Sequence, residues 1–224
     1  MNKQIAALTA RMILEAGAVR YSAAQPFFLS SGWASPVYID VGRLISFPRI
    51  RASLMDLAAQ TVLARVGFEQ FDTVAGVEAS GIAYSAWIAE RLSLPLLYVR
   101  RKPLGFGREA PIEGALAPGR RVLLVDDVTT DGRTKIARVR ALRAIDARAD
   151  HVLVMFFYDI FPETVRLLSE ERISLHYLAS WKHVLDAARA GGYFDGAAAD
   201  EVQRFLAAPA RWSLEHGGIG AFPR

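Results

Sequence analysis

Two adjacent acids, Asp126 and Asp127, stand where an apolar run passes into a polar loop that contains a glycine. Residues 122–135 read VLLVDDVTTDGRTK, and a helical pattern follows. In a parallel sheet these polar residues lie at the carboxyl end of a strand, where ligands of such sheets bind. The backbone amides of residues 130–134 would then face outward at a helix N-terminus, beside three threonine hydroxyls. The pattern predicts a phosphate-binding loop.

The acid pair needs a partner other than phosphate, which would repel it. Sugar hydroxyls, a metal ion or a developing cation would serve, and a phosphorylated sugar satisfies both the acids and the loop. The alternative is structural, because Asp and Thr commonly cap helices and turn the chain. Capping does not need two adjacent acids at the end of an apolar strand, so we favour a sugar-phosphate site.

The composition describes a chain that can bury a sizeable core. Of its 224 residues, 52% are hydrophobic and 22% are charged, which excludes a disordered chain and favours one domain. A net charge of +4 favours small anions over nucleic acid as partners. The absence of cysteine excludes disulfides, thiolate metal sites and a cysteine nucleophile. The histidines, at positions 151, 176, 183 and 216, stand apart in the sequence and predict no metal-ligand cluster.

No segment of the sequence predicts export or membrane insertion. Residues 1–19 mix charges into apolar residues at helical spacing, as an amphipathic helix does and a signal peptide does not. The longest apolar run, residues 152–158, is far shorter than the roughly 20 residues that span a bilayer. We therefore expect a cytoplasmic protein without a membrane partner.

Short apolar runs bounded by Gly, Pro or charged residues predict the strands that must position the acid pair. They cover residues 73–77, 96–99, 122–125 and 152–158. Helical patterns at 81–92 and 134–147 stand between several of these runs. The alternation of strand and helix predicts an α/β fold with a mostly parallel sheet.

The remaining segments predict a single domain, residues 1–224, with three parts. A hood of irregular strands and turns, about 20–48, is indicated by prolines, glycines and serines among aromatics. The core covers about 68–180, after a helical pattern at 49–66, and C-terminal helices cover about 181–224. Residues 100–118 form a long connection rich in Gly and Pro, and connections of that length are usually functional lids or disordered.

Four motifs resemble those of one enzyme family and occur in its order. Residues 122–134 are similar to the signature with which type I phosphoribosyltransferases bind 5-phosphoribosyl 1-diphosphate (PRPP). Residues 29–40, LSSGWASPVYID, resemble the hood motif of orotate phosphoribosyltransferases. Residues 76–92, GVEASGIAYSAWIAERL, and 98–114, YVRRKPLGFGREAPIEG, are similar to that family's Gly-rich strand-to-helix segment and its mobile catalytic loop. The chain is identified as a member of the orotate phosphoribosyltransferase family.

This resemblance implies a fold and a reaction. The fold would be the type I phosphoribosyltransferase fold, a mostly parallel central sheet flanked by helices, with an N-terminal hood and a C-terminal helical segment. The reaction would be the Mg²⁺-dependent transfer of the phosphoribosyl group of PRPP to orotate, which gives orotidine 5′-phosphate and pyrophosphate in pyrimidine biosynthesis. The Mg²⁺ would be held mainly by PRPP, and the enzyme would be a homodimer.

The resemblance also implies roles for individual residues. Asp126 and Asp127 would hold the ribose hydroxyls, and together with Arg101 and Lys102 they form the expected catalytic set. The expected PRPP contacts are Arg100, Arg101, Lys102, Asp126, Asp127, Val128, Thr129, Thr130, Asp131, Gly132, Arg133 and Thr134. Orotate would contact Ser30, Tyr38, Ile39, Ser80 and Thr130, so that Thr130 lies between the two substrates.

The chain departs from the family at the loop and at the phosphate site. A Lys and a His usually stand where this chain has Leu104 and Phe106, so two groups expected on pyrophosphate are missing. Nearby cations at 101, 102 or 108 could replace them, unless they are only solvated charges. Asp131 replaces a small neutral residue, and its carboxylate opposes a 5′-phosphate unless it points away or Arg133 neutralises it.

Two other functions stay open at this point. Without the loop Lys and His, the chain could be a sensor or regulator that binds PRPP with weak or no catalysis. Such a regulator would be expected to carry an added interaction module, for which 224 residues leave little room. The chain could also transfer the phosphoribosyl group to another nucleobase, which the hood motif argues against.

Overall fold

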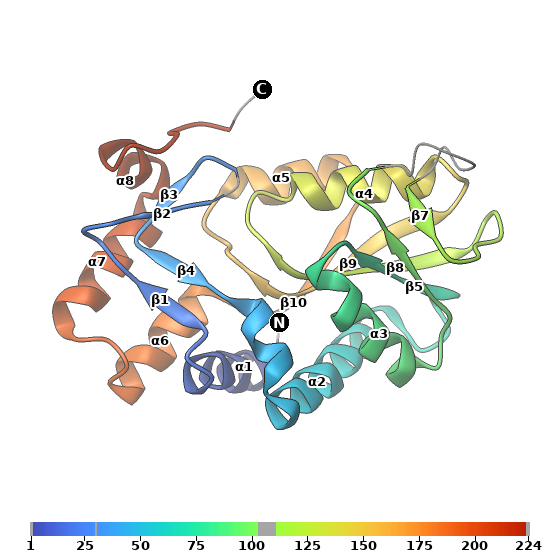
Figure 1. Ribbon diagram of the computed structural model, residues 1–224, viewed down its shortest axis with the longest axis horizontal. Helices are drawn as coiled ribbons and strands as arrows, with labels where there is room; N and C mark the ends of the chain where they lie inside the picture. The colour runs from blue at the N-terminus through green and yellow to red at the C-terminus, as the bar shows by residue number, and fades with distance from the viewer. Residues whose placement is uncertain (1, 30, 103–110, 223–224) are drawn as a thin grey trace.

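A six-stranded sheet forms the centre of the computed structural model, which describes residues 2–29, 31–102 and 111–222 (Figure 1). Its strands lie in the order β10-β9-β8-β5-β6-β7, and only the β6–β7 pair is antiparallel. The bounds are β5 (Thr73–Val77), β6 (Leu96–Val99), β7 (Ile112–Glu113), β8 (Arg121–Thr129), β9 (Arg148–Phe157) and β10 (Ser174–Ser180). The predicted α/β fold with a mostly parallel sheet is confirmed.

The central strands are apolar on both sides because helices cover both faces of the sheet. Every residue of β5 is buried, and in β9 the run from Val152 to Phe157 is buried throughout. Strand β8 is longer than its apolar run predicted, since its pairing with β9 continues through Asp126 to Thr129. The acid pair therefore lies within the last residues of β8, and pairing with β9 holds the backbone of this part of the strand.

Two layers of helices bury the sheet, as Figure 1 shows. One layer contains α1 (Lys3–Glu15), α2 (Pro48–Val66) and α3 (Ser80–Leu92), and the other contains α4 (Arg133–Arg143) and α5 (Pro162–Glu170). Helix α4 ends earlier than the pattern at 134–147 predicted, because the chain turns at Asp146, where φ is 63°, to enter β9. Among the described residues, no helix is both long enough and apolar enough to cross a membrane.

The segment before α2 forms two small antiparallel ribbons. Strand β1 (Val19–Tyr21) pairs with β4 (Val37–Ile39), and β2 (Phe27–Phe28) pairs with β3 (Ala34–Ser35). A 3₁₀ helix, η1 (Val41–Ser46), leads from β4 to α2. We call this segment, residues 19–46, the hood. The Tyr84 hydroxyl of α3 donates a hydrogen bond of 2.7 Å to the carbonyl of Val41 and fastens the hood to the core.

Three helices follow the sheet: α6 (Trp181–Gly191), α7 (Gly196–Ala207) and α8 (Pro209–Glu215). Helices α6 and α7 pack on one another and α6 packs on α1, whereas α8 packs on β3 of the hood. The polypeptide therefore returns from its C-terminal part to the segment near its start, and Figure 1 shows α8 beside β2 and β3.

A glycine allows helix α3 to approach the acid pair. A Cβ atom on Gly81 would lie 2.8 Å from Oδ1 of Asp126 and 2.9 Å from the carbonyl oxygen of Val125. We predict that Gly81→Ala lowers the free energy of unfolding by about 1–3 kcal/mol, because the packed helix and strand must separate. Urea unfolding measures this change.

The matched control is Gly196→Ala in the first turn of α7, where an added Cβ meets nothing within 4 Å. This variant should be neutral or slightly stabilising, because alanine favours a helix. An unchanged urea midpoint for Gly81→Ala would show that the contact between α3 and β8 tolerates a methyl group.

Candidate active site

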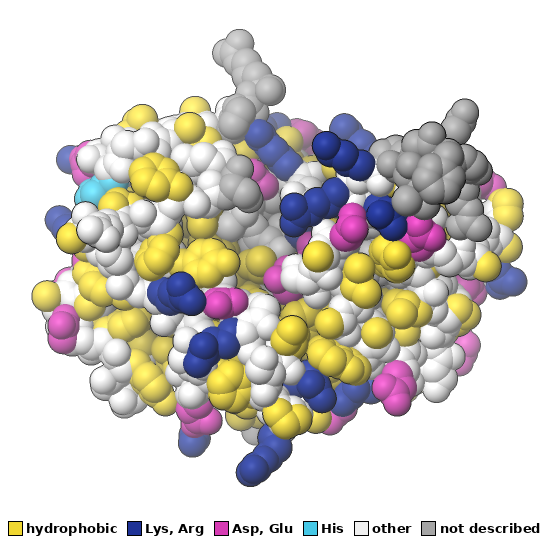
Figure 2. Space-filling model, viewed as in Figure 1, with side chains coloured by type: hydrophobic (Ala, Val, Ile, Leu, Met, Phe, Trp, Pro, Cys, Tyr) yellow, Lys and Arg dark blue, Asp and Glu magenta, His cyan; other side chains and the backbone are white. Residues whose placement is uncertain are grey.

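A polar pocket of about 500 Å³ opens at the carboxyl ends of β5 and β8. It lies where an open parallel sheet binds its ligands. Figure 2 shows Lys and Arg side chains gathered beside the hollow in the middle of this face, with acidic side chains close by. The lining residues are Val77, Glu78, Ser80, Arg101, Asp126, Asp127, Val128, Thr129, Thr130, Asp131, Thr134, Lys135 and Arg138.

Asp126 forms a buried ion pair with Lys135. The two side chains are only 6% and 5% exposed, and Nζ of Lys135 donates to Oδ2 of Asp126. Lys135 lies in the first turn of α4, where the helix dipole disfavours a cation. Its position is explained by Asp126, because a buried charge needs a charged partner. The pair joins the end of β8 to the start of α4.

Asp127 has a different electrostatic environment from its neighbour. Burial raises the pKa of Asp127 to about 7, and the nearby carboxylate of Asp126 adds to the rise. The Lys135 ammonium and a hydrogen bond from the Ser80 side chain oppose it. Near neutral pH the Asp127 side chain can therefore exist in either protonation state, and when protonated it donates a hydrogen bond as well as accepting one.

The loop between β8 and α4 is shaped by Asp131 and Gly132. Gly132 has φ 77° and ψ −13°, a left-handed conformation that glycine adopts without strain. The carboxylate of Asp131 is buried, and it accepts a hydrogen bond of 3.2 Å from the backbone N–H of Arg133. The acid is therefore turned toward its own loop. This contact also occupies one of the amides that the sequence predicted for phosphate.

Helix α5 supports the same loop from outside the pocket. The Thr164 hydroxyl donates a hydrogen bond of 3.2 Å to the carbonyl of Thr130. A Cβ atom on Gly132 would approach Cγ2 of Thr164 to 3.2 Å, so the loop and the helix pack closely. Thr134 is exposed at the mouth of the pocket.

The three expected pyrophosphate cations are placed differently. Arg101 lines the pocket, and its backbone N–H donates to the carboxylate of Glu78 at 2.6 Å. Arg100 instead pairs with Glu113 of β7 at 3.3 Å, and neither Arg100 nor the exposed Lys102 lines the pocket. Leu104, Phe106 and Arg108 lie outside the described residues.

Two cations that the sequence analysis missed line the same pocket, Lys135 and Arg138. They are three residues apart on α4 and so share one face of the helix. Nε of Arg138 is buried and has no hydrogen-bond partner. A helical projection of α4 from the predicted phosphate-binding loop could have found both residues.

Two of the expected orotate contacts line the pocket, whereas Tyr38 and Ile39, in β4 of the hood, do not. Ser80 begins α3 and lines the pocket, as does Thr130. Burial raises the pKa of the Tyr38 phenol, and the charges of Asp40 and Asp127 add to the rise. The backbone of Ile39 already hydrogen-bonds the buried Tyr158 phenol. One of its hydrogen-bonding groups is therefore occupied before a ligand binds. Ser30 lies outside the described residues.

The histidines are less separate than their sequence positions indicate. His151 of β9 and His176 of β10 face one another, with Nδ1 and Nε2 3.0 Å apart. Adjacent strands brought them together. Within the described ranges there is no group of three or more His, Cys, Asp or Glu side chains that could hold a metal ion.

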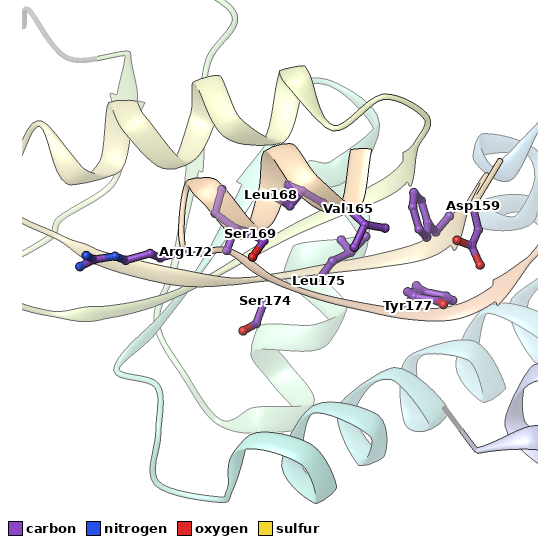
Figure 3. Close-up of a pocket in the computed structure, with 10 residues that line it drawn as sticks. Asp159, Val165, Leu168, Ser169, Arg172, Ser174, Leu175 and Tyr177 are labelled. Carbon is purple, nitrogen blue, oxygen red and sulfur yellow. The ribbon is translucent and has the colours of Figure 1, made fainter. Parts of the chain in front are cut away.

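A second cavity of about 500 Å³ lies between α5 and the ends of β9 and β10. Figure 3 shows Arg172 at one end of it and Asp159 with Tyr177 at the other, with aliphatic side chains between them. Its lining includes neither the acid pair nor any residue of the loop 130–134. The polar pocket at β8 therefore remains the candidate active site.

The pKa of Asp127 predicts a pH dependence of stability. The folded pKa, about 7, lies above the ordinary value of about 4, so its contribution to folding is fully present below pH 4 and is lost as the pH rises toward 7. We predict that the stability of the wild type relative to Asp127→Asn falls over this window, by at most about 1.4 kcal/mol per pH unit.

Urea unfolding at several pH values between 4 and 8 measures this difference. Asp150→Asn, at an exposed acid paired with Arg143, is the matched control and should show no such trend. A constant difference between the wild type and Asp127→Asn would mean that Asp127 titrates as it does in an unfolded chain.

Comparison with known proteins assigns the chain to a family. The phosphoribosyl transferase domain family matches residues 41–156. The chain is 53% identical over 210 residues to an orotate phosphoribosyltransferase from Roseobacter denitrificans, covering 94% of this chain and 93% of that protein.

Two solved structures have a similar fold. Orotate phosphoribosyltransferase from Aeropyrum pernix has a TM-score of 0.70 and 30% identity, covering 83% of this chain and 99% of that one. UMP synthase from Leishmania donovani has a TM-score of 0.77 and 25% identity over 90% of this chain, which spans only 42% of that longer protein. The motifs, the fold and these relatives agree: the chain belongs to the orotate phosphoribosyltransferase family.

Proposed function

We propose that this chain transfers the phosphoribosyl group of PRPP to orotate and releases orotidine 5′-phosphate and pyrophosphate, a reaction of pyrimidine biosynthesis. The observation that carries the proposal is the pocket itself, which combines the acid pair, the phosphate-binding loop and cations at the carboxyl end of β8. Family membership supports orotate as the acceptor.

PRPP has three parts that correspond to three parts of the pocket. Its 5′-phosphate would be bound by the loop 130–134, where the remaining backbone amides and the Thr130 and Thr134 hydroxyls are donors. Its ribose hydroxyls would bind Asp126 and Asp127. Its pyrophosphate would face Arg101 and Arg138, which line the pocket. Lys135 is already occupied by Asp126, so we assign it to the acid pair.

The reaction breaks the bond between C1 of the ribose and a pyrophosphate oxygen, and it forms a bond from C1 to a ring nitrogen of orotate. Pyrophosphate leaves with the electron pair, and the proton on the attacking nitrogen passes to water. Positive charge develops at C1 and negative charge on the leaving group, so fixed carboxylates near the ribose and cations near pyrophosphate both stabilise the transition state. Orotate is already an anion, so no strong general base is required.

The donor set of the pocket fits a Mg²⁺ ion that is held mainly by its substrate. Asp126 is paired with Lys135, so Asp127 is the member of the acid pair that would offer an oxygen to the ion, and diphosphate and water would supply the others. Bound in this way, the ion would neutralise charge on the leaving group. The homodimer and the cytoplasmic location expected from the family resemblance are proposed on family membership alone.

A direct assay tests the function. We predict a loss of the ultraviolet absorbance of orotate that depends on both Mg²⁺ and PRPP, with no comparable turnover of uracil, adenine or hypoxanthine. PRPP binding without turnover of any base would favour the sensor, and turnover of another base would favour a different acceptor. Either result would contradict the proposal.

The role of Arg138 has its own test. We predict that Arg138→Ala lowers kcat/KM for PRPP about tenfold or more, because a preorganised donor to the leaving group is lost. Steady-state kinetics with PRPP varied measures this. Arg140→Ala is the control on the same helix, at an exposed residue paired with Glu171. If both variants have equal kinetics, Arg138 does not contact the pyrophosphate.

A further inference from the structure

The C-terminal tail, defined here as residues 213–222, is bonded to the hood. The backbone N–H of Ala34 donates to the Ser213 hydroxyl at 2.9 Å, and the N–H of Ile219 donates to the carbonyl of Gly32 at 3.1 Å. Ser213 is fully buried. The N–H of Gly218 donates to the carbonyl of Ser213 at 2.8 Å, which closes the turn. These bonds hold the tail on the β2–β3 ribbon.

The close approach of the tail depends on a glycine. A Cβ atom on Gly218 would overlap the backbone nitrogen of Ala34 and the Ser213 hydroxyl, and it would lie 2.8 Å from Cβ of Ala34. The tail therefore lies directly on the backbone of the hood, with no room for a side chain between them.

Phe222 connects the tail to two further segments through an aromatic cluster. Its ring centroid is 5.6 Å from that of Trp33 in the hood and 5.4 Å from that of Phe161, the residue before α5. Trp33 and Phe161 are buried and lie 4.3 Å apart. Phe222 itself is only partly buried. It packs on the outside of the Trp33–Phe161 contact, which does not depend on it.

The same ring contacts the phosphate-binding loop. The guanidinium carbon of Arg133 lies over the Phe222 ring, 5.6 Å from its centroid, within the range of a cation–π interaction. Arg133 follows Gly132 at the start of α4. Phe222 thus contacts the hood, the segment before α5 and the phosphate-binding loop at once, although these segments are far apart in the sequence.

We propose that Phe222 is a positioning residue for the phosphoribosyl transfer: its contact with the Arg133 guanidinium fixes the start of α4 beside the phosphate-binding loop, and the tail that carries it fastens the hood relative to that loop. The inference rests on the proposed function, in which the loop binds PRPP, and on the contacts of the hood with orotate that the family resemblance implies. The two substrates must meet in a defined geometry, and small displacements of the groups that hold them are costly in rate. The tail supplies a constraint between their two binding segments.

The first experiment distinguishes the effect of the aromatic ring of Phe222 from the effect of its side-chain volume. Ribose 5-phosphate is the probe, and calorimetry measures its Kd. We expect Phe222→Leu to raise this Kd about threefold to tenfold, the size of a lost cation–π interaction, and Phe222→Tyr to restore the wild-type value. Phe68→Ala, at an exposed phenylalanine of a distant turn (79% exposed), is the control and should bind as the wild type does.

The second experiment separates the tail from the hood. We expect Gly218→Ala to raise the KM for orotate several-fold, with kcat lowered less, while Gly196→Ala leaves both unchanged. Thermal melting of each variant shows that the protein measured is folded. Because the Trp33–Phe161 contact does not need Phe222, we expect Phe222→Leu to melt within a few degrees of the wild type.

The outcomes distinguish this inference from the function on which it rests. If the wild type binds ribose 5-phosphate and converts orotate, but Phe222→Leu and Gly218→Ala do the same with wild-type constants, the tail is only packing and the inference is wrong. If the wild type neither binds ribose 5-phosphate nor converts orotate, the proposed function fails, and the inference fails with it.

Discussion

The buried ion pair between Asp126 and Lys135 is the interaction on which the candidate site depends. Both side chains are buried, so each charge needs the other as its partner. Removing one would leave an uncompensated buried charge and lower the stability of the fold by several kcal/mol. The chain between them, residues 127–134, must therefore fold so that the end of β8 and the first turn of α4 meet. That requirement sets the path of the loop proposed to bind phosphate. Gly132 provides the left-handed turn, and Asp131 takes up an amide inside the loop.

The same pair makes the two acids unequal. Asp126 has an ammonium partner, whereas burial beside Asp126 raises the pKa of Asp127 to about 7. Of two sugar hydroxyls, one could then donate to the ionised Asp126, and the other could bond Asp127, which when protonated both donates and accepts. Around this centre the hood is held by Tyr84 from the core and by the C-terminal tail from outside. The site is therefore assembled from segments that span nearly the whole chain. Contacts made elsewhere in the fold hold these segments in place.

Four strands of the six-stranded central sheet, β5, β6, β8 and β9, could be predicted because they are short apolar runs, and this signal is local. The run at 122–125 was recognised, but β8 continues to Thr129 because β9 pairs with it there, which no property of the acids themselves indicates. Strand β10 was not predicted, since Ser174 and His176 interrupt its apolar residues and its place is set by pairing with β9. The His151–His176 contact was missed for the same reason: a separation of 25 residues is bridged only by strand pairing.

The residue types of the candidate site could be identified from the sequence, whereas their arrangement in space could not. An acid pair followed by threonines and a glycine before a helix indicates a sugar-phosphate site, because hydroxyl, amide and carboxylate groups have fixed donor and acceptor properties wherever they stand. Which cations join that site depends on three-dimensional proximity. Arg100 pairs with Glu113 and leaves the pocket, while Lys135 and Arg138 enter it from α4. The contact of Phe222 with Arg133 likewise exists only because the folded chain returns to its hood, since charge and packing energies fall off with distance in space and take no account of distance along the sequence.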